Sequence, residues 1–321
     1  MTLSYLIRRM FTMVLTIFLA LTFSFLLIRL LPGDPAERYY GDPRLPIEIK
    51  TEIKAAFGLD KPVYMQYFIF LGNAVKGDLG ISYTYRRSVV GVVMERMPWT
   101  LLLTTVPTVL SMVLGLKIGT YIAFNRLKFF DRFMRSVAFA LNSVPTFWLA
   151  LLMVMGFAFY LPIFPLQGMI DPLAVTMPER FFSVLRHAAL PWITIFMVTL
   201  PSFAVHVRNL TINILGEDFI ITAKAKGLKK AQIRKKHVLR NALGPLFSIL
   251  TLRVAGLVGG SVLIETIFSW RGMGLLVLEA SRGSDYPLLQ ATVLITIILV
   301  IVANFVADIL QAVFDPRVRY S

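Results

Sequence analysis

The sequence predicts an all-helical membrane protein whose chain crosses the bilayer six times. Of its 321 residues, 57% are hydrophobic and only 16% are charged. The mean hydropathy of +0.72 lies outside the range of soluble globular chains. Six apolar runs have about the 20 residues that a transmembrane helix needs. The connections between these runs alternate between strongly basic and nearly neutral, as expected when successive connections lie on opposite sides of a membrane.

The first apolar run, residues 10–28, contains no charged residue. Arg8 and Arg9 precede it, as in a signal peptide. The run is longer than the roughly 7–15 residues of a signal-peptide core, however, and no small residues suited to cleavage follow it. We therefore interpret it as a retained span. The other predicted spans are residues 101–124, 137–160, 190–207, 243–267 and 286–307.

The distribution of charge predicts the orientation of the chain. Nearly all of the net charge of +15 falls in residues 8–9, 125–136 and 208–240 and in the tail from residue 311. These segments share one side of the membrane if six spans are present, and the positive-inside rule assigns that side to the cytoplasm. We expect a cytoplasmic (inner) membrane protein with both termini in the cytoplasm. The positive-inside rule and attraction to anionic lipid then explain the excess of basic residues, and we expect no nucleic acid partner.

The connection after the first span, residues 32–98, is divided by proline and glycine. We expect an extracytoplasmic insert of short helices over residues 46–58, 62–76 and 87–97, the second lying against the spans or the membrane interface. The predicted divisions of the chain are a cytoplasmic end with the first span (1–31), the insert (32–98) and a five-span core (99–321) that contains a cytoplasmic loop at 208–244.

Small residues and prolines interrupt several of the predicted spans. Gly115 and Gly119 are four residues apart, as are Gly256 and Gly260. Glycines at this spacing let helices approach closely, so we expect close helix contacts at these positions. Kinks are expected at three prolines, which a bundle of helices tolerates because neighbouring groups satisfy the freed backbone. These prolines are Pro107, Pro145 and Pro201.

Several kinds of chemistry are excluded or disfavoured. No Gly-Lys dipeptide occurs, so the chain has no phosphate-binding Walker A loop and cannot hydrolyse ATP by that route. No cysteine is present. His187, His206 and His237 are isolated from one another and lack carboxylate-rich surroundings, so we predict neither a metal site nor a catalytic residue.

Three ionisable residues within the predicted spans are candidates for a translocation path or for intramembrane pairs: Lys117, Arg253 and Glu265. A charge at this depth costs several kcal/mol unless it is paired or hydrated. Arg253 and Glu265 are about 18 Å apart along one predicted helix, too far for direct pairing. Arg29 and Asp308 lie at span ends. We expect each side chain either to extend to the membrane interface or to form a structural ion pair.

The segment ITAKAKGLKKAQIRKKHVLRNALGP, residues 221–245, belongs to the most basic connection of the chain. Residues 218–226 have helix-forming composition. Glu217 and Asp218 lie at the start and Lys224 and Lys226 at the end, which suits the helix dipole. Gly227 then supplies a break. Residues 228–240 form a second helical stretch, whose cations are available to solvent, lipid head groups or an acidic protein surface.

Eight stretches resemble, in order, the B-type membrane subunit of the oligopeptide and dipeptide ABC import permeases, a family that also includes nickel and oligosaccharide importers. They extend over nearly the whole chain. The stretches are RLLPGDPA (29–36), FGLDKPVYMQY (57–67), GDLGISY (77–83), SVPTFWLALL (143–152), TAKAKGL with HVLRNALGP (222–228 and 237–245), GGSVLIETIFSWRGMG (259–274), DYPLLQ (285–290) and DPRVR (315–319).

The resemblance implies a type I ABC importer permease fold and a set of partners. Such a subunit pairs with a second, homologous permease subunit, and the pair lies on two ATP-binding subunits that hold ATP and Mg. An extracytoplasmic substrate-binding protein delivers the cargo. This chain itself then binds no cofactor and is not an enzyme. Its contact with the ATPases is a short coupling helix and the turn after it: Asp218, Ile221, Thr222, Ala223, Lys224, Ala225, Lys226, Gly227 and Leu228.

The coupling motif departs from the general permease pattern. That pattern has Glu-Ala-Ala six, five and four residues before the glycine, and this chain has Ile221, Thr222 and Ala223 there. No salt bridge from such an acid to the ATPase is therefore expected. The small side chains of Thr222, Ala223 and Ala225 would let the helix lie close in a groove, and Ile221 and Leu228 would supply apolar contact.

Several alternatives remain at the level of sequence. Peptide is the first choice of substrate and oligosaccharide the second. A self-contained secondary carrier or channel would instead use Lys117, Arg253 and Glu265 in an ion path, although the chain lacks a convincing internal repeat. A membrane enzyme or scaffold is a third class, for which no catalytic constellation is found. The basic loop alone is also explained by topology and attraction to anionic lipid.

Overall fold

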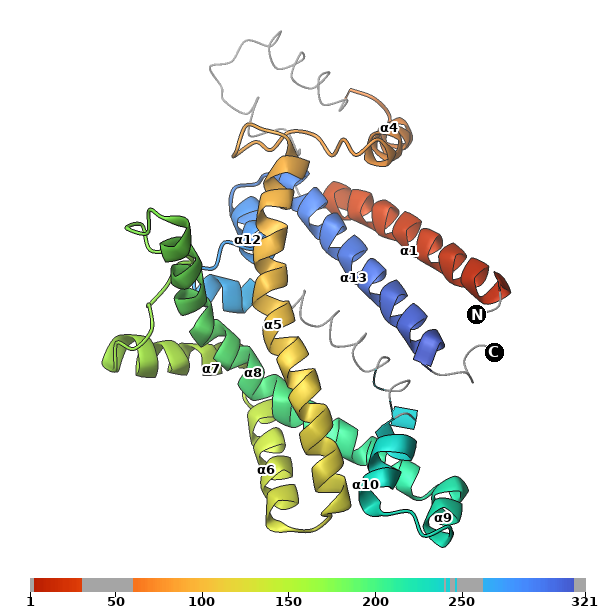
Figure 1. Cartoon of the computed structure of the whole chain (residues 1–321). Coiled ribbons are helices and arrows are strands. Elements are labelled where there is room, and N and C mark those ends of the chain that lie inside the picture. Colours follow the sequence, from red (N-terminus) through yellow and green to blue (C-terminus); the bar gives the residue numbers. More distant parts are fainter. Residues whose placement is uncertain (1–2, 31–59, 240, 243–245, 247–261, 315–321) are drawn as a thin grey trace.

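The structure is a computed structural model that describes residues 3–30, 60–239, 241–242, 246 and 262–314 (Figure 1). Helices dominate these residues, whose only β-type pairing is an isolated bridge between Ile81 and Ser88. The elements are α1 (Leu3–Leu30), α4 (Val63–Val75), α5 (Val89–Phe124), α6 (Phe129–Ser143), α7 (Thr146–Met153), η1 (Val154–Tyr160), α8 (Met177–Leu215), α9 (Asp218–Ala225), α10 (Lys230–Gln232), η2 (Ile233–Val238), α12 (Met273–Arg282) and α13 (Tyr286–Phe314).

Four helices in the described part are long and apolar enough to cross a membrane: Ile7–Leu26 within α1, all of α5, all of α8, and Tyr286–Ile309 within α13. They contain the first, second, fourth and last of the predicted spans, which are thereby confirmed as apolar helices. Most of the predicted span 243–267 falls outside the described residues, which include only 246 and 262–267 of it. The number of six spans therefore stays a prediction.

The predicted span 137–160 is not a straight helix. It is formed by α6 and by α7 with η1, and the two pieces meet at 97°. The break falls at Pro145, which precedes the first residue of α7. Proline disfavours helical backbone in the residue before it, and Val144 is accordingly extended, with φ −100° and ψ 129°. Counted as one bent span, the pair raises the number of candidate spans in the described part to five.

The start of α5 differs from the sequence-based expectation. A short insert helix over residues 87–97 and a separate span were expected, but α5 runs without a break from Val89 to Phe124. Pro98 and Pro107 lie inside it, since a packed helix tolerates the loss of one backbone hydrogen bond. The expected third insert helix is thus the beginning of the second span. The expected helix over residues 46–58 lies outside the described residues.

The expected insert helix after Pro62 is present as α4, and it packs against α1. The hydroxyl groups of Tyr67 and Thr22 are 2.6 Å apart. The rings of Tyr67 and Phe25 meet edge to face with centroids 5.3 Å apart. Of the two positions expected for this helix, against the spans or at the membrane interface, the structure shows a contact with α1. No residue of α4 is itself buried within the described chain.

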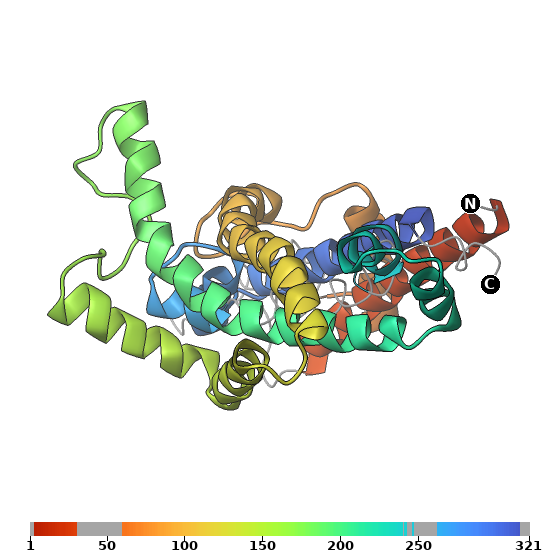
Figure 2. The same ribbon diagram turned by 60° about the horizontal axis from the view of Figure 1, so that its bottom comes forward.

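The helices α5 and α8 cross at the centre of the molecule, as both views show (Figures 1 and 2). At the crossing, a Cβ added to Gly115 would lie 2.8 Å from Cδ1 of Phe203, and one added to Gly119 would lie 2.5 Å from the carbonyl oxygen of Ala204. The two backbones approach so closely because these positions lack side chains. The predicted close contact at this glycine pair is confirmed, whereas Gly256 and Gly260 lie outside the described residues.

The helices α1 and α13 lie side by side (Figure 1). Arg9 and Asp308 form an ion pair between them with 2.8 Å from Nη1 to Oδ2. The structural pair that the sequence offered as one explanation of Asp308 is therefore present. The side chain of Arg29 lies outside the described part.

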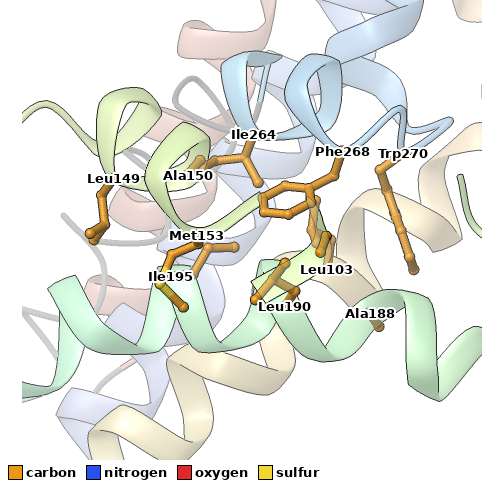
Figure 3. Close-up of a cluster of buried hydrophobic side chains, with 11 residues drawn as sticks. Leu103, Leu149, Ala150, Met153, Ala188, Leu190, Ile195, Ile264, Phe268 and Trp270 are labelled. Carbon is orange, nitrogen blue, oxygen red and sulfur yellow. The ribbon is translucent and has the colours of Figure 1, made fainter. Parts of the chain in front are cut away.

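A buried apolar cluster joins α5, α7 and α8 to the segment before α12 (Figure 3). Leu103, Ile195 and Phe268 are among its members. A second cluster lies toward the opposite end of α8, where it joins α8 to α9 and η2 through Val207, Ile220 and Val238 among others. The helical segment between residues 216 and 239 is therefore packed onto the bundle and is not an isolated loop.

Candidate functional site

The predicted coupling segment forms a small helical hairpin at one end of the molecule (Figure 1). It begins after α8, contains α9, and turns at Gly227 into α10 and η2. Gly227 has φ +76°, in the left-handed region that glycine adopts without strain. The helix and the glycine break expected from the sequence are thus both present. The second helical stretch is completed by a π-helical turn, Ile233–Val238.

The two sides of α9 have different surroundings. Ile220 is fully buried and Ala223 is 3% exposed, and both pack into the second apolar cluster. On the other side Ile221 is 58% exposed, and Thr222 and Ala225 are exposed as well. The exposed side of α9 therefore presents one large apolar side chain flanked by small ones.

The other predicted coupling residues divide in the same way. Leu228 is partly buried against the second cluster, so it and Ala223 contact this chain's own core. Asp218, Lys224 and Lys226 are exposed. Further exposed cations follow the turn, and within the described residues none of them forms an ion pair. They are Lys229, Lys230, Arg234, Lys235 and Lys236.

A buried ion pair at the same end of the bundle was not anticipated from the sequence. Asp131, in the first turn of α6, is 1% exposed, and Arg208, near the end of α8, is 8% exposed. Nη2 of Arg208 donates to Oδ2 of Asp131 at 3.0 Å, and its Nε donates to Oδ1. The backbone N–H of Leu127 also donates to Oδ2, at 3.0 Å. The pair thus fixes the turn between α5 and α6 to the part of α8 that leads into α9.

The three candidate path residues are not brought together in the described part. Glu265 is fully buried, whereas Lys117 is exposed on α5. Glu265 accepts a hydrogen bond from Thr100 on α5. Thr100 and Lys117 are about 25 Å apart along α5 at a rise of about 1.5 Å per residue, so Glu265 and Lys117 are not neighbours. Arg253 lies outside the described residues.

Glu265 accepts hydrogen bonds from two elements near the end of the bundle opposite α9. Thr100 Oγ1 donates to Oε1 at 2.8 Å, and the backbone N–H of Leu275 donates to Oε2 at 2.8 Å. The backbone N–H of Met273 donates in turn to Thr100 Oγ1 at 2.7 Å. A Cβ on Gly272 would lie 2.5 Å from Oε1 of Glu265. The carboxylate therefore holds the start of α12 against α5, as an intramembrane pairing group would.

Two of the motifs singled out in the sequence meet at this opposite end. Ser82, in GDLGISY, donates from its hydroxyl to Oδ2 of Asp285, in DYPLLQ, at 2.6 Å. The backbone N–H of Thr84 donates to the same oxygen at 2.8 Å. Oδ1 of Asp285 accepts from the N–H of Leu288 in the first turn of α13, at 3.2 Å. Asp285 is fully buried, so it joins the segment before α5 to the start of α13.

Among the described residues, no group of three histidine or acidic side chains lies close enough to hold a metal ion. The long apolar helices, with the basic hairpin at one end and the Asp285 junction at the other, define a helical membrane protein.

Comparison with known proteins identifies the family. Residues 115–320 match the model of the binding-protein-dependent transport system inner membrane component, and residues 2–104 match the model of the N-terminal part of such membrane components. The chain therefore belongs to the family of binding-protein-dependent transport system inner membrane components. The resemblance stated from the sequence motifs is confirmed. As a permease component, the chain is not itself an enzyme.

Several curated relatives match over almost their whole length. The di/tripeptide transport system permease protein DppB of Pseudomonas aeruginosa is 36% identical over 99% of both chains. The oligopeptide transport system permease protein AppB of Bacillus subtilis is 34% identical, again over 99% of both. The glutathione transport system permease protein GsiC of Escherichia coli is 32% identical over 99% of this chain and all of the relative. These names give no support to the oligosaccharide alternative.

A solved structure supports the fold alone. A chain of the MetNI methionine ABC transporter in an inward-facing crystal form superposes with a TM-score of 0.56 at 20% identity. The match covers 70% of this chain and 96% of that chain. The helical permease architecture is thereby shared with an ABC importer. The matched family is described as a component of a binding-protein-dependent transport system. A component of a system is not a self-contained carrier or channel, so the description gives no support to that alternative.

Proposed function

We propose that this chain is one of two permease subunits that form the translocation pathway of a peptide-importing ABC transporter. The observation that carries the proposal is the match over 99% of the chain to permease proteins whose names specify di- and tripeptides, oligopeptides and glutathione. All three names describe substrates built from amino acids. A short peptide is therefore the substrate class best supported.

The partners follow from this assignment. A second, homologous permease subunit completes the pathway, two ATP-binding subunits hold ATP and Mg, and an extracytoplasmic binding protein delivers the peptide. With both termini in the cytoplasm, α9 faces the ATPases and the junction around Asp285 faces the binding protein. The exposed cations after Gly227 support this orientation, because short basic connections favour the cytoplasmic side.

Coupling to ATP hydrolysis is assigned to residues 217–240. The exposed side of α9, with Ile221 between Thr222 and Ala225, is the surface that enters a groove on an ATPase. The buried side, with Ile220 and Ala223, carries the movement into α8 through the second cluster. Small residues on both sides keep the distance short between the ATPase surface and the bundle.

Closure of the ATPases on ATP then moves α9, and the bundle passes from inward-open to outward-open. The Asp131–Arg208 pair supports this route, because it makes the α5–α6 turn follow the end of α8. Near the other end, Glu265 has the role of a structural intramembrane group. Lys117 remains the candidate that borders the path, since it is exposed on α5.

The chain contains no cysteine, so a single engineered cysteine gives an unambiguous cross-linking site. In membranes that contain the whole transporter, Ile221→Cys is expected to cross-link to an ATPase subunit. Asn213→Cys, which is exposed at the end of α8, is the control and is expected not to do so. Gentle detergent purification should also recover a second permease and two ATPases. A homogeneous single chain, with no cross-link at position 221, would overturn the assignment.

A further inference from the structure

A pocket of about 420 Å³ lies at the end of the bundle opposite α9. Its walls come from three segments distant in sequence: the segment before α5 and its first turns, the connection between η1 and α8, and the residue before Gly272. Three arginines line it, Arg87, Arg96 and Arg271, with one carboxylate, Glu95. Trp99 and Tyr85 supply aromatic surface.

Most of the charged groups around the pocket are already paired. Arg87 binds both oxygens of Glu95 at 2.6 Å. Arg96 donates from Nη2 to the Tyr85 hydroxyl at 3.1 Å and lies 3.7 Å from Oε2 of Glu279. Tyr85 donates in turn to Glu279 at 2.8 Å. Burial and then this bond to Glu279 raise the pKa of Tyr85, so its phenol remains a donor at neutral pH.

Arg271 is the exception. Its backbone is fixed on both sides, since its N–H donates to the sulfur of Met169 at 3.0 Å and its carbonyl accepts from Nη1 of Arg96 at 3.4 Å. The next residue, Gly272, lies against the buried carboxylate of Glu265. The side chain of Arg271 is exposed, and its guanidinium has no hydrogen bond or ion pair in the part of the chain that the structure describes. One positive charge is thus held at the pocket without a counter-ion.

We propose that this pocket receives the C-terminal carboxylate of the transported peptide, with Arg271 as the group that binds it. The inference rests on the proposed function of peptide import. Peptides differ in their side chains but share this carboxylate, so one fixed guanidinium serves any sequence. Arginine binds a carboxylate through two parallel hydrogen bonds. Trp99 and Tyr85 then provide a wall for the last side chain of the peptide.

The properties of the pocket match this ligand. Its volume falls within the range of about 300–1,000 Å³ that is usual for small-molecule sites. A carboxylate would neutralise the excess charge. Because Arg271 is exposed, the interaction is screened by water and weak, which suits a site that the substrate has to leave at every cycle. The position opposite α9 is where cargo from an extracytoplasmic binding protein would arrive.

The test uses the complete transporter in proteoliposomes with its loaded binding protein. Uptake of radiolabelled trialanine and of its C-terminal amide is measured for the unaltered chain, for Arg271→Gln and for Arg271→Lys. Arg86→Gln is the control, because Arg86 is exposed nearby but does not line the pocket. For Arg271→Gln we expect uptake of the acid to fall about threefold to fivefold, the effect of losing an exposed ion pair. Arg271→Lys should recover part of the rate.

The ratio of acid uptake to amide uptake is the decisive quantity. Any preference of the binding protein for the acid contributes equally to this ratio in every variant. A lower ratio of acid to amide uptake in Arg271→Gln would therefore reflect the loss of Arg271 from the pocket. An unchanged ratio would overturn the inference. A higher concentration of binding protein needed to stimulate ATP hydrolysis, with the same ratio, would also overturn it and assign Arg271 to docking of that protein. Absence of trialanine uptake by the unaltered transporter would instead contradict the proposed function.

Discussion

Asp131 and Arg208 form a buried ion pair that joins the turn between α5 and α6 to the end of α8, directly before the coupling segment. The two residues are far apart in the sequence and belong to different predicted cytoplasmic connections. Their contact makes the α5–α6 turn and the end of α8 one unit. In the proposed mechanism, a displacement of α9 would therefore be passed to α6 as well as to α8.

Replacing Asp131 by Asn should destabilise the protein strongly. The change leaves the Arg208 guanidinium buried without a counter-charge, which typically costs about 3–5 kcal/mol. Thermal unfolding in detergent, followed by loss of the monodisperse peak on size-exclusion chromatography, measures the effect. Arg132→Gln, at an exposed position of the same helix, is the control and should unfold as the unaltered chain does. Equal unfolding temperatures for Asp131→Asn and the unaltered chain would show that the pair is not needed.

Adding one methyl group at Gly119 should weaken the contact between α5 and α8. The new Cβ would lie 2.5 Å from a backbone oxygen and 2.6 Å from Cβ of Val207, so the helices must separate, at a cost of about 1–3 kcal/mol. Gly91→Ala is the matched control, because it lies on α5 with nothing within 4 Å of its added Cβ. It should be neutral or stabilising, since alanine favours helix. If both variants unfold alike, the close approach at Gly119 is unimportant.

Replacing Glu265 by Gln should loosen the start of α12. The side-chain amide of glutamine has one acceptor oxygen, so Thr100 and Leu275 cannot both keep their present bonds. One buried donor then loses its partner, at about 1–3 kcal/mol. Hydrogen exchange of residues 272–282 should become faster in the variant. The pH dependence of transport should be unchanged, because the group is structural. A loss of that dependence with unchanged exchange would favour a role in an ion path.

Substitutions at Gly227 should separate coupling from folding. The residue has φ +76° and an open surrounding, with nothing within 4 Å of an added Cβ. Alanine then costs only the strain of left-handed backbone, about 1–2 kcal/mol. Proline, whose φ is fixed near −65°, cannot adopt this turn. We expect Gly227→Ala to retain uptake and Gly227→Pro to abolish it while the chain stays in the membrane and ATP hydrolysis becomes independent of the substrate. Uptake at the normal rate by Gly227→Pro would contradict the role of the turn.

Local composition was sufficient to predict several elements. Apolar length identified α1, α5, α8 and α13, and the Gly115–Gly119 spacing anticipated a close helix contact. The turn at Gly227 followed from a glycine between two helical stretches. These features depend on residues near one another in the sequence, so periodicity and spacing report them directly.

Other features depend on what lies opposite each residue and could not be predicted. The bend at Pro145 was expected from the sequence, but proline chemistry alone gave no sign that α5 would continue without a break through Pro98. In the sequence, Asp131 and Arg208 entered only the charge count that predicts the orientation of the chain. Their pairing depends on the contact between α6 and α8, which the sequence does not show. Ala223 was assigned to partner contact, but it faces this chain's own core because Ile220 and Ala223 share the buried side of α9.

The central claim is that ATP hydrolysis on separate subunits drives peptide import through this chain. Uptake of radiolabelled trialanine into proteoliposomes tests it most directly, with the permease pair, ATPases, binding protein and ATP each omitted in turn. The account predicts uptake only when all are present, and its loss when Gly227 is replaced by Pro. Uptake by this chain alone, driven by an ion gradient and indifferent to ATP, would contradict it.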